Sequence, residues 1–232
     1  MKILRHLFQS SIGKKYLMAG SGLVLFGFVA GHMVGNLQVF LGPEVLNRYA
    51  HFLQSLGELL WVIRFGLLAM LGLHIWSAVM LTIENRRARP LTYEGGGTYA
   101  ASVASRTMIY TGLIIAAFVV YHLLHFTVRA PVDLTPQDLA TMKTTLHGQE
   151  VHDVYRMVIV GFQQPLVAGF YIVAVTLLSF HLGHGVAAMF QSLGLKNRAW
   201  NPAIQQFGTV ASWMLAIGYV SIPAAVWLGL IK

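Results

Sequence analysis

Four histidines lie well inside long stretches of the sequence that carry almost no charge. A side chain that can ionise is costly inside a membrane, so its presence there points to a function. Neutral imidazole is also a common axial ligand of haem iron. The four residues are His32, His74, His122 and His181. Their type and their setting predict haem ligation by histidine within a membrane.

Each of these histidines, taken alone, also fits simpler roles. An intramembrane imidazole can hydrogen-bond a neighbouring helix, line a proton path or face a water-filled cavity. The set of four changes this balance, because each member falls in a different one of four successive apolar stretches. Two imidazoles that face each other from different helices can hold one iron from both sides. Haem ligation is therefore the favoured interpretation of the set.

The elements that position these histidines are membrane-spanning helices. Hydrophobic residues make up 56% of the 232 residues and charged ones 10%, so a water-soluble core cannot account for the apolar surplus. Between Lys15 and Glu44 no residue is charged, and this gap exceeds the roughly 20 residues that a spanning helix needs. We expect crossings near residues 17–40, 59–83, 107–128, 163–189 and 207–231.

The expected fold is an all-α integral membrane protein, with residues 1–232 forming one membrane domain. Helices one to four are expected to form a di-haem four-helix bundle, and the fifth helix is expected at its periphery. The fourth charge-free stretch is too short for two crossings and a turn. Its start, around residues 161–165, is therefore predicted to be a turn or an interfacial helix end.

Threading the chain back and forth sorts the four histidines into two depth layers. From the helix rise, His32 and His122 lie about 5 and 7 Å to the outer side of their helix midpoints. His74 lies about 4 to 5 Å and His181 about 7 to 8 Å to the inner side. This predicts an outer haem held by helices one and three and an inner haem held by helices two and four.

Two further histidines leave the choice of ligand open. His125 and His184 each follow a predicted ligand by three residues, on nearly the same helical face. Only one member of each pair can bind a given iron. The other could bind a haem propionate, a quinone or a backbone carbonyl, and helix packing is the leading alternative for it.

The basic residues are distributed unequally between the two sides of the predicted bundle. The side that holds the N-terminus carries ten basic residues against Glu84 and Glu94, and the other side carries six of each sign. The ten are Lys2, Arg5, Lys14, Lys15, Arg86, Arg87, Arg89, Arg106, Lys196 and Arg198. This bias predicts a cytoplasmic N-terminus and explains the sequence pI near 9.9 without nucleic acid. The absence of cysteine excludes thiolate-bound haem and iron–sulfur clusters in this chain.

Several strings of residues together carry a resemblance over nearly the whole chain. They are GHMVGNLQVF at 31–40, RYAHFLQSLG at 48–57, LHIWSAVMLTIENRRARP at 73–90, VYHLLHF at 120–126 and FHLGHGVAAMFQSLG at 180–194. In this order on five helices, the sequence resembles the cytochrome b membrane-anchor subunit of succinate dehydrogenase/fumarate reductase, in the single-subunit, five-helix, di-haem class. The resemblance matches His32, His74, His122 and His181 to the four axial ligands, and favours His122 over His125 and His181 over His184.

The resemblance also implies cofactors and partners. It implies two haems b and a quinone, with menaquinone the expected type, in the bacterial cytoplasmic membrane. A flavoprotein with FAD and an iron–sulfur subunit would bind the cytoplasmic face, so that the chain serves a succinate:quinone oxidoreductase without touching succinate. Glu58, at the outer mouth of helix two, is a candidate for the quinone site and otherwise marks a helix end. Ser179 stands where some fumarate-reducing members carry a proton-conducting glutamate, which favours succinate oxidation.

Two other functions compete with this interpretation. One is the cytochrome b subunit of another quinone-linked enzyme, such as a hydrogenase, formate dehydrogenase or nitrate reductase, which distributes its haem ligands differently over its helices. The other is a haem-free, proton-coupled transporter whose histidines relay protons. Pairing of His32 with His122 and of His74 with His181 would argue against the first, and absence of haem absorption would argue for the second.

Overall fold

Five helices in the structure are long and apolar enough to cross a membrane, by length and composition. The structure is a computed structural model that describes residues 2–88, 103–130 and 138–232, and most of these residues are helical. Arg89 and Glu94, which enter the charge comparison above, lie outside the described residues. The prediction of a mostly helical protein with five apolar spans is confirmed, with the addition of one two-stranded β-hairpin, and the five spans are consistent with a multi-pass membrane protein.

The five long helices agree with the expected crossings in number and order. They are α2 (Ser11–Leu37), α4 (Glu58–Arg87), α5 (Val103–His122), α7 (Pro165–Ser192) and α8 (Asn201–Trp227). A π-helical segment, η2 (Leu123–Val128), extends α5. Most of the long helices begin or end several residues beyond the predicted bounds, since hydropathy marks the apolar middle of a helix and not its polar ends. A break at Gln164, which has an extended backbone, lies where the sequence predicts a turn.

Shorter elements connect the spans. They are α1 (Lys2–Gln9), η1 (Gln38–Leu41), α3 (Pro43–Ser55), η3 (Leu139–Thr141), β1 (Lys143–Leu146), β2 (Gln149–His152) and α6 (Val154–Gln163). The sequence predicts neither α1, α3 nor the hairpin of β1 and β2. These segments are amphipathic or polar, and a search for long charge-free stretches passes over them.

The chain forms two compact units, and each of the five long helices contributes a section to both. Unit 1 comprises residues 1–28, 64–113 and 180–212. Unit 2 comprises residues 29–63, 114–179 and 213–232. Unit 2 contains the larger buried apolar cluster, which is centred on sections of α5, α6, α7 and α8 and includes Phe118, Phe162, Ala168 and Tyr171.

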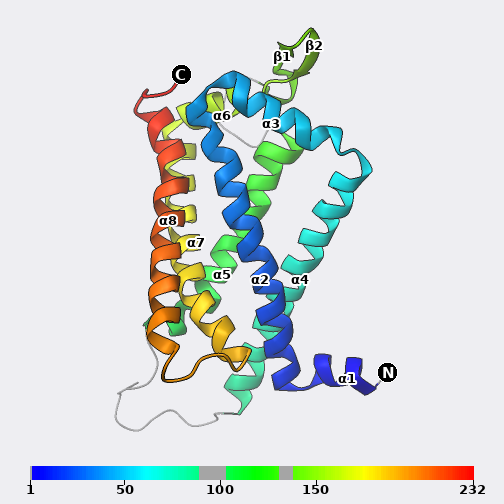
Figure 1. The fold of residues 1–232 in the computed structure, drawn as a ribbon, viewed down its shortest axis with the longest axis vertical. Helices are drawn as coiled ribbons and strands as arrows, with labels where there is room; N and C mark the ends of the chain where they lie inside the picture. Colours follow the sequence, from blue (N-terminus) through cyan, green and yellow to red (C-terminus); the bar gives the residue numbers. More distant parts are fainter. Residues whose placement is uncertain (1, 89–102, 131–137) are drawn as a thin grey trace. The chain divides into compact units, whose positions relative to one another are not determined.

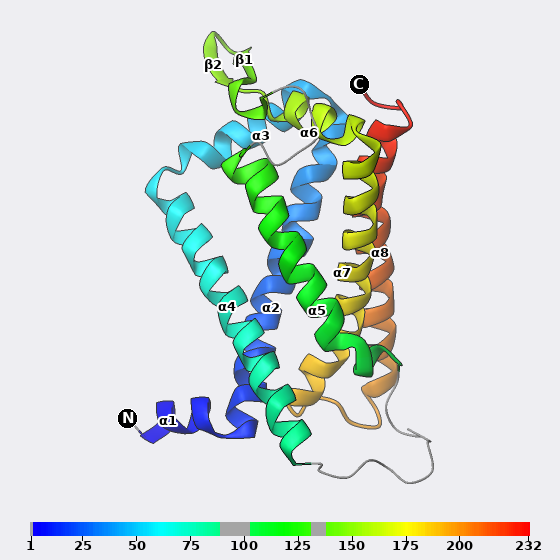
Figure 2. The same cartoon turned by 180° about the vertical axis from the view of Figure 1, so that it is seen from behind.

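At one end of unit 2, the helices α3 and α6 lie beside the β-hairpin (Figures 1 and 2). Buried Asn47 in α3 connects these elements, because its Nδ2 donates to the carboxylate of Asp153 at 2.9 Å. The Asn47 side-chain oxygen accepts from the backbone N–H of Tyr155, also at 2.9 Å. Asp153 is the N-cap of α6 and accepts from the N–H of Arg156. One amide side chain thus fixes α3 against the first turn of α6.

The hairpin turns at His147 and Gly148, both of which have positive φ. Two successive residues in this conformation are typical of the tight turn that matches the twist of antiparallel strands. His152, at the end of β2, contacts the Met157 sulfur through Nε2 at 3.4 Å. Met157 belongs to a small buried cluster with Leu139 and Met142, so His152 connects the hairpin to packed side chains of α6.

In unit 1, α1 turns sharply away from α2 (Figure 1). The turn depends on Gly13, because a Cβ atom there would lie 2.4 Å from the carbonyl oxygen of Leu7. Phe8 packs against Trp76 of α4, with ring centroids 5.5 Å apart. The close backbone approach and the aromatic contact together hold α1 against the long helices.

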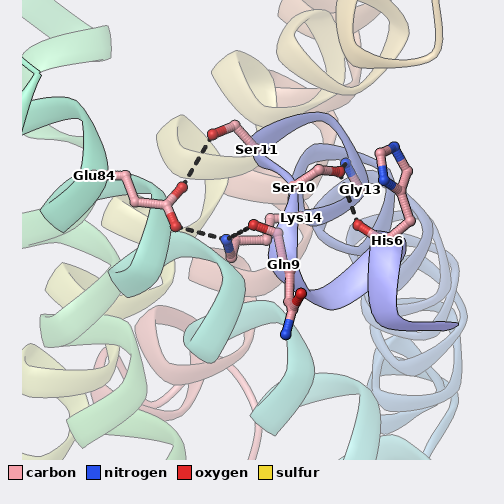
Figure 3. A network of polar contacts seen from close by, with 7 residues as sticks. All are labelled: His6, Gln9, Ser10, Ser11, Gly13, Lys14 and Glu84. Carbon is pink, nitrogen blue, oxygen red and sulfur yellow. Dashed lines mark hydrogen bonds and ion pairs between the residues drawn. The ribbon is translucent and has the colours of Figure 1, made fainter. Parts of the chain in front are cut away.

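A polar network lies at the junction of α1, α2 and α4 (Figure 3). The Lys14 ammonium donates to Glu84 at 2.6 Å and to the backbone carbonyl of Gln9 at 2.9 Å. Ser11 donates to the second carboxylate oxygen of Glu84 at 3.1 Å. The Lys14 side chain is only 4% exposed, whereas that of Glu84 is 32% exposed. Lys14 is therefore a buried cation whose charge is balanced by one carboxylate from a different helix.

Replacement of Lys14 by alanine is expected to lower the thermal unfolding midpoint of the detergent-solubilised protein. The change removes the cation that holds α2 to α4 and leaves Glu84 without its closest positive partner. Lys143→Ala is the matched control, since Lys143 also lies 2.6 Å from a carboxylate, that of Glu150, but both side chains are mostly exposed. An exposed pair contributes little. Equal shifts for the two variants would contradict the assigned role of burial.

The hairpin of unit 2 is expected to weaken as the pH falls. Burial, with a smaller contribution from the charge of Arg129, holds the pKa of His152 below its ordinary value of 6.5. As the pH falls, His152 therefore gains its proton in the unfolded hairpin before it does so in the folded one. The free energy of unfolding of the hairpin is highest above about pH 6.5 and declines below it, towards the lower pKa of His152 in the folded state. Amide exchange at Val151, corrected for intrinsic rates, should be faster at pH 5 than at pH 7. His152→Gln should abolish this dependence and His147→Gln should keep it; the reverse pattern would refute the assignment.

Candidate functional site

In unit 2, His32 of α2 and His122 of α5 face each other. Their ring centroids are 5.9 Å apart and their planes are inclined by 80°. Phe118 and Phe126 each place a ring 5.9 Å from that of His122, and Tyr219 of α8 lies 6.5 Å from His32. The two imidazoles therefore meet within a shell of aromatic side chains.

The tyrosine hydroxyl of Tyr171 in α7 lies between two histidines of α5 and η2. It is 3.0 Å from Nδ1 of His125 and 3.4 Å from Nδ1 of His122, so the bond to His125 is the better formed. His125 is fully buried and packs on Phe126 with a centroid distance of 4.0 Å. The surroundings of His125 are thus α7 and Phe126, whereas His122 is the residue that meets His32.

The π-helical segment η2 begins directly after His122. It ends at Arg129, whose φ of 59° is left-handed. Such segments widen one turn of a helix and occur often at functional sites. His125 lies within this segment and His122 directly before it.

In unit 1, His74 of α4 lies against α2. Its Nδ1 is 3.2 Å from the carbonyl oxygen of Met18 and 3.3 Å from the hydroxyl of Ser21. A Cβ atom built on Gly22 would lie 3.2 Å from Cε1 of the ring. The imidazole is thus seated directly on the backbone of α2.

His181 of α7 has closely similar surroundings in the same unit. Its Nδ1 is 3.2 Å from the hydroxyl of Thr111 in α5, and a Cβ atom on Gly112 would lie 3.4 Å from Cε1. The two histidines of the predicted inner pair therefore both lie in unit 1, and those of the predicted outer pair lie in unit 2, where their rings are in contact.

The other residues that the sequence analysis singled out are His184, Glu58 and Ser179. His184 is partly exposed on α7 and lies near enough to Lys196 for their charges to interact. Glu58 is exposed in the first turn of α4, where a negative charge favours the helix dipole. Ser179 is buried and donates to the carbonyl of Val175.

Four residues beside the histidines were not predicted from the sequence. They are Ser21, Thr111, Tyr171 and Tyr219. Each is a hydroxyl-bearing residue within an apolar stretch, and buried hydroxyls need partners. That signal is visible in the sequence. The identity of the partner is not, because it depends on how each helix is rotated about its axis.

Among the residues that the structure describes, no three histidine or acidic side chains lie together in a group that could hold a metal ion. Each predicted haem would have only two histidine ligands and so would not form such a group. Comparison of the chain with protein-family models, curated proteins and solved structures gave no match. The interpretation of the site therefore depends on its own geometry.

Replacement of Tyr171 by phenylalanine is expected to destabilise the protein by about 1–2 kcal/mol, because the buried Nδ1 atoms of His122 and His125 both lose a partner. Thermal unfolding in detergent measures the effect. Tyr155→Phe is the control, since the Tyr155 hydroxyl bonds the exposed carbonyl of Lys232. The two losses should differ clearly; similar values would indicate that the Tyr171 hydroxyl does not stabilise these histidines.

Proposed function

We propose that this protein is a di-haem cytochrome b that anchors a succinate:quinone oxidoreductase, respiratory complex II, in the membrane. The observation that carries the proposal is the approach of His32 to His122, whose ring centroids are 5.9 Å apart. The second pair, His74 and His181, shares unit 1. The contact of the first pair and the shared unit of the second pair support two sets of axial ligands.

The spacing of the first pair fits an iron held between two imidazoles. A metal–nitrogen bond of about 2 Å, with about 1 Å from each nitrogen to its ring centre, gives roughly 6 Å between centroids. The observed 5.9 Å agrees with this value. The aromatic rings of Phe118 and Phe126 surround His122 with apolar surface suited to a porphyrin.

For the second pair, the tautomer of His74 is compatible with iron binding. A carbonyl oxygen can only accept, so the contact with Met18 places a proton on Nδ1 of His74. In that tautomer Nε2 keeps its lone pair, which is the electron pair that binds iron. When bound, the two haems would supply one-electron transfer. The protein's own part is to hold and orient the imidazoles and to exclude water from them.

The resemblance of the sequence supports the assignment of partners. A flavoprotein with FAD and an iron–sulfur subunit would dock on the cytoplasmic face and deliver electrons from succinate. The excess of basic residues on the N-terminal side supports a cytoplasmic N-terminus in a bacterial inner membrane. The acceptor would be a quinone, with menaquinone the expected type and Glu58 a candidate near its outer site.

The pairing of helices weighs against the other quinone-linked cytochromes. In this chain α2 pairs with α5 through His32 and His122, and the histidines of α4 and α7 share unit 1. A hydrogenase, formate dehydrogenase or nitrate reductase subunit would distribute its ligands differently. One observation favours the haem-free transporter. His125, Tyr171 and His122 form a chain of hydrogen-bond contacts, which resembles a proton relay.

Haem content decides between these functions. A reduced-minus-oxidised spectrum with quantitative haem extraction should give two haems b per chain in the purified protein. Alanine at His32, His74, His122 or His181 should lower the ratio to about one, or convert one low-spin haem to high spin, since each replacement removes one axial ligand.

His125→Ala and His51→Ala serve as controls and should retain both haems, because His125 bonds Tyr171 and His51 is exposed on α3. Retention of both low-spin haems in His122→Ala but not in His125→Ala would reverse the choice of ligand. A colourless wild-type preparation would end the proposal and favour the transporter. Copurification of flavin- and iron-containing subunits would distinguish the complex II anchor from the other cytochromes.

A further inference from the structure

The two histidines of unit 1 share a local arrangement that comes from different helices. In each case Nδ1 faces a hydroxyl, from Ser21 for His74 and from Thr111 for His181, at 3.3 and 3.2 Å. In each case the next residue along that helix is a glycine. The dipeptides are Ser21-Gly22 in α2 and Thr111-Gly112 in α5.

Both hydroxyls also contact carbonyl oxygens of their own helices. Ser21 donates to the carbonyl of Leu17 at 2.7 Å, and Thr111 donates to the carbonyl of Met108 at 3.1 Å or that of Thr107 at 3.2 Å. A hydroxyl has only one proton. The Ser21 proton is directed to Leu17, because that distance is much shorter than the 3.3 Å to His74, so the Ser21 oxygen accepts from the imidazole. His74 therefore carries its proton on Nδ1 and keeps the Nε2 lone pair. The Thr111 hydroxyl lies 3.1, 3.2 and 3.2 Å from Met108, Thr107 and His181, so the same direction at His181 is part of the inference.

The glycines allow the rings to approach the helix backbone. A Cβ atom would come within 3.2 Å of His74 Cε1 at Gly22 and within 3.4 Å of His181 Cε1 at Gly112. At Gly20, two residues earlier, a Cβ atom would meet nothing within 4 Å. A Cβ atom at Gly22 would therefore crowd the His74 ring by a few tenths of an ångström, whereas one at Gly112 would be in ordinary van der Waals contact with His181.

We infer that Ser21 and Thr111 are matched positioning residues that fix the tautomer and orientation of His74 and His181, so that Nε2 of each is directed to a bound haem iron. This inference rests on the proposed function. An acceptor on Nδ1–H makes an imidazole a stronger donor to its metal and so stabilises ferric over ferrous iron. The two hydroxyls therefore lower the reduction potential of the haem in unit 1.

The test compares Ser21→Ala and Thr111→Val with matched controls in the purified protein. Ser77→Ala and Thr82→Val are the controls, because their hydroxyls donate to the carbonyls of Leu73 and Ala78, four residues back, as Ser21 does to Leu17. Redox titration followed by visible spectroscopy gives the potentials of the two haems, and electron paramagnetic resonance gives their ferric low-spin signals.

The expected result is a shift of one haem only. In Ser21→Ala and Thr111→Val, the haem that disappears in His74→Ala should titrate at a more positive potential with an altered resonance signal. The other haem and both controls should match wild type. Thr111→Ser restores the hydroxyl and should return the potential to that of wild type.

Each other outcome also decides the question. Unchanged potentials and signals in a wild-type protein with two haems would overturn the inference and leave the proposed function standing. Loss of the haem in Thr111→Val supports the inference where Thr111→Ser recovers it, and overturns it where Thr111→Ser does not, since size and not the hydroxyl would then matter. A wild-type protein without haem would overturn both.

Discussion

An imidazole among apolar helices must have its N–H group hydrogen-bonded, because an unpaired polar group in such surroundings costs free energy. His74, His181 and His122 contact such partners through Nδ1, at the carbonyl of Met18 and the hydroxyls of Ser21, Thr111 and Tyr171. The bond that satisfies the polar group also sets the orientation of the ring. Stability and the direction of Nε2 therefore depend on one interaction.

The hydroxyl partners differ between the units. In unit 1 the Ser21 hydroxyl directs its proton to the carbonyl of Leu17, and the Thr111 hydroxyl contacts two carbonyls of its own helix as well as His181. In unit 2 the single hydroxyl of Tyr171 lies between His122 and His125, and the distances favour His125. Each histidine of unit 1 thus has a hydroxyl of its own, whereas in unit 2 one phenol connects two histidines.

Small residues make these contacts possible, since a ring can reach a helix backbone only where side chains are absent. Gly22 favours such an approach by His74, whose Cε1 a Cβ atom there would meet at 3.2 Å. The same principle holds between helices, as a Cβ atom at Gly208 of α8 would lie 2.8 Å from the carbonyl oxygen of Gly183 in α7. Polar side chains hold the ends of the helices. In unit 1 they form the ion pair of Lys14 with Glu84, and in unit 2 the hydrogen bond of Asn47 to Asp153.

The sequence by itself determined the five apolar spans, the break near Gln164 and the positions of the histidines along their helices, because hydropathy and charge are read along one dimension. It left His122 and His125 as alternatives and did not predict α1, α3 or the hairpin. The tertiary structure placed His122 against His32, and His125 against Tyr171. Only the tertiary structure could assign these partners, because the partner of a side chain depends on how each helix is rotated about its axis. Neither that rotation nor the π-helical turn after His122 follows from hydrophobic periodicity.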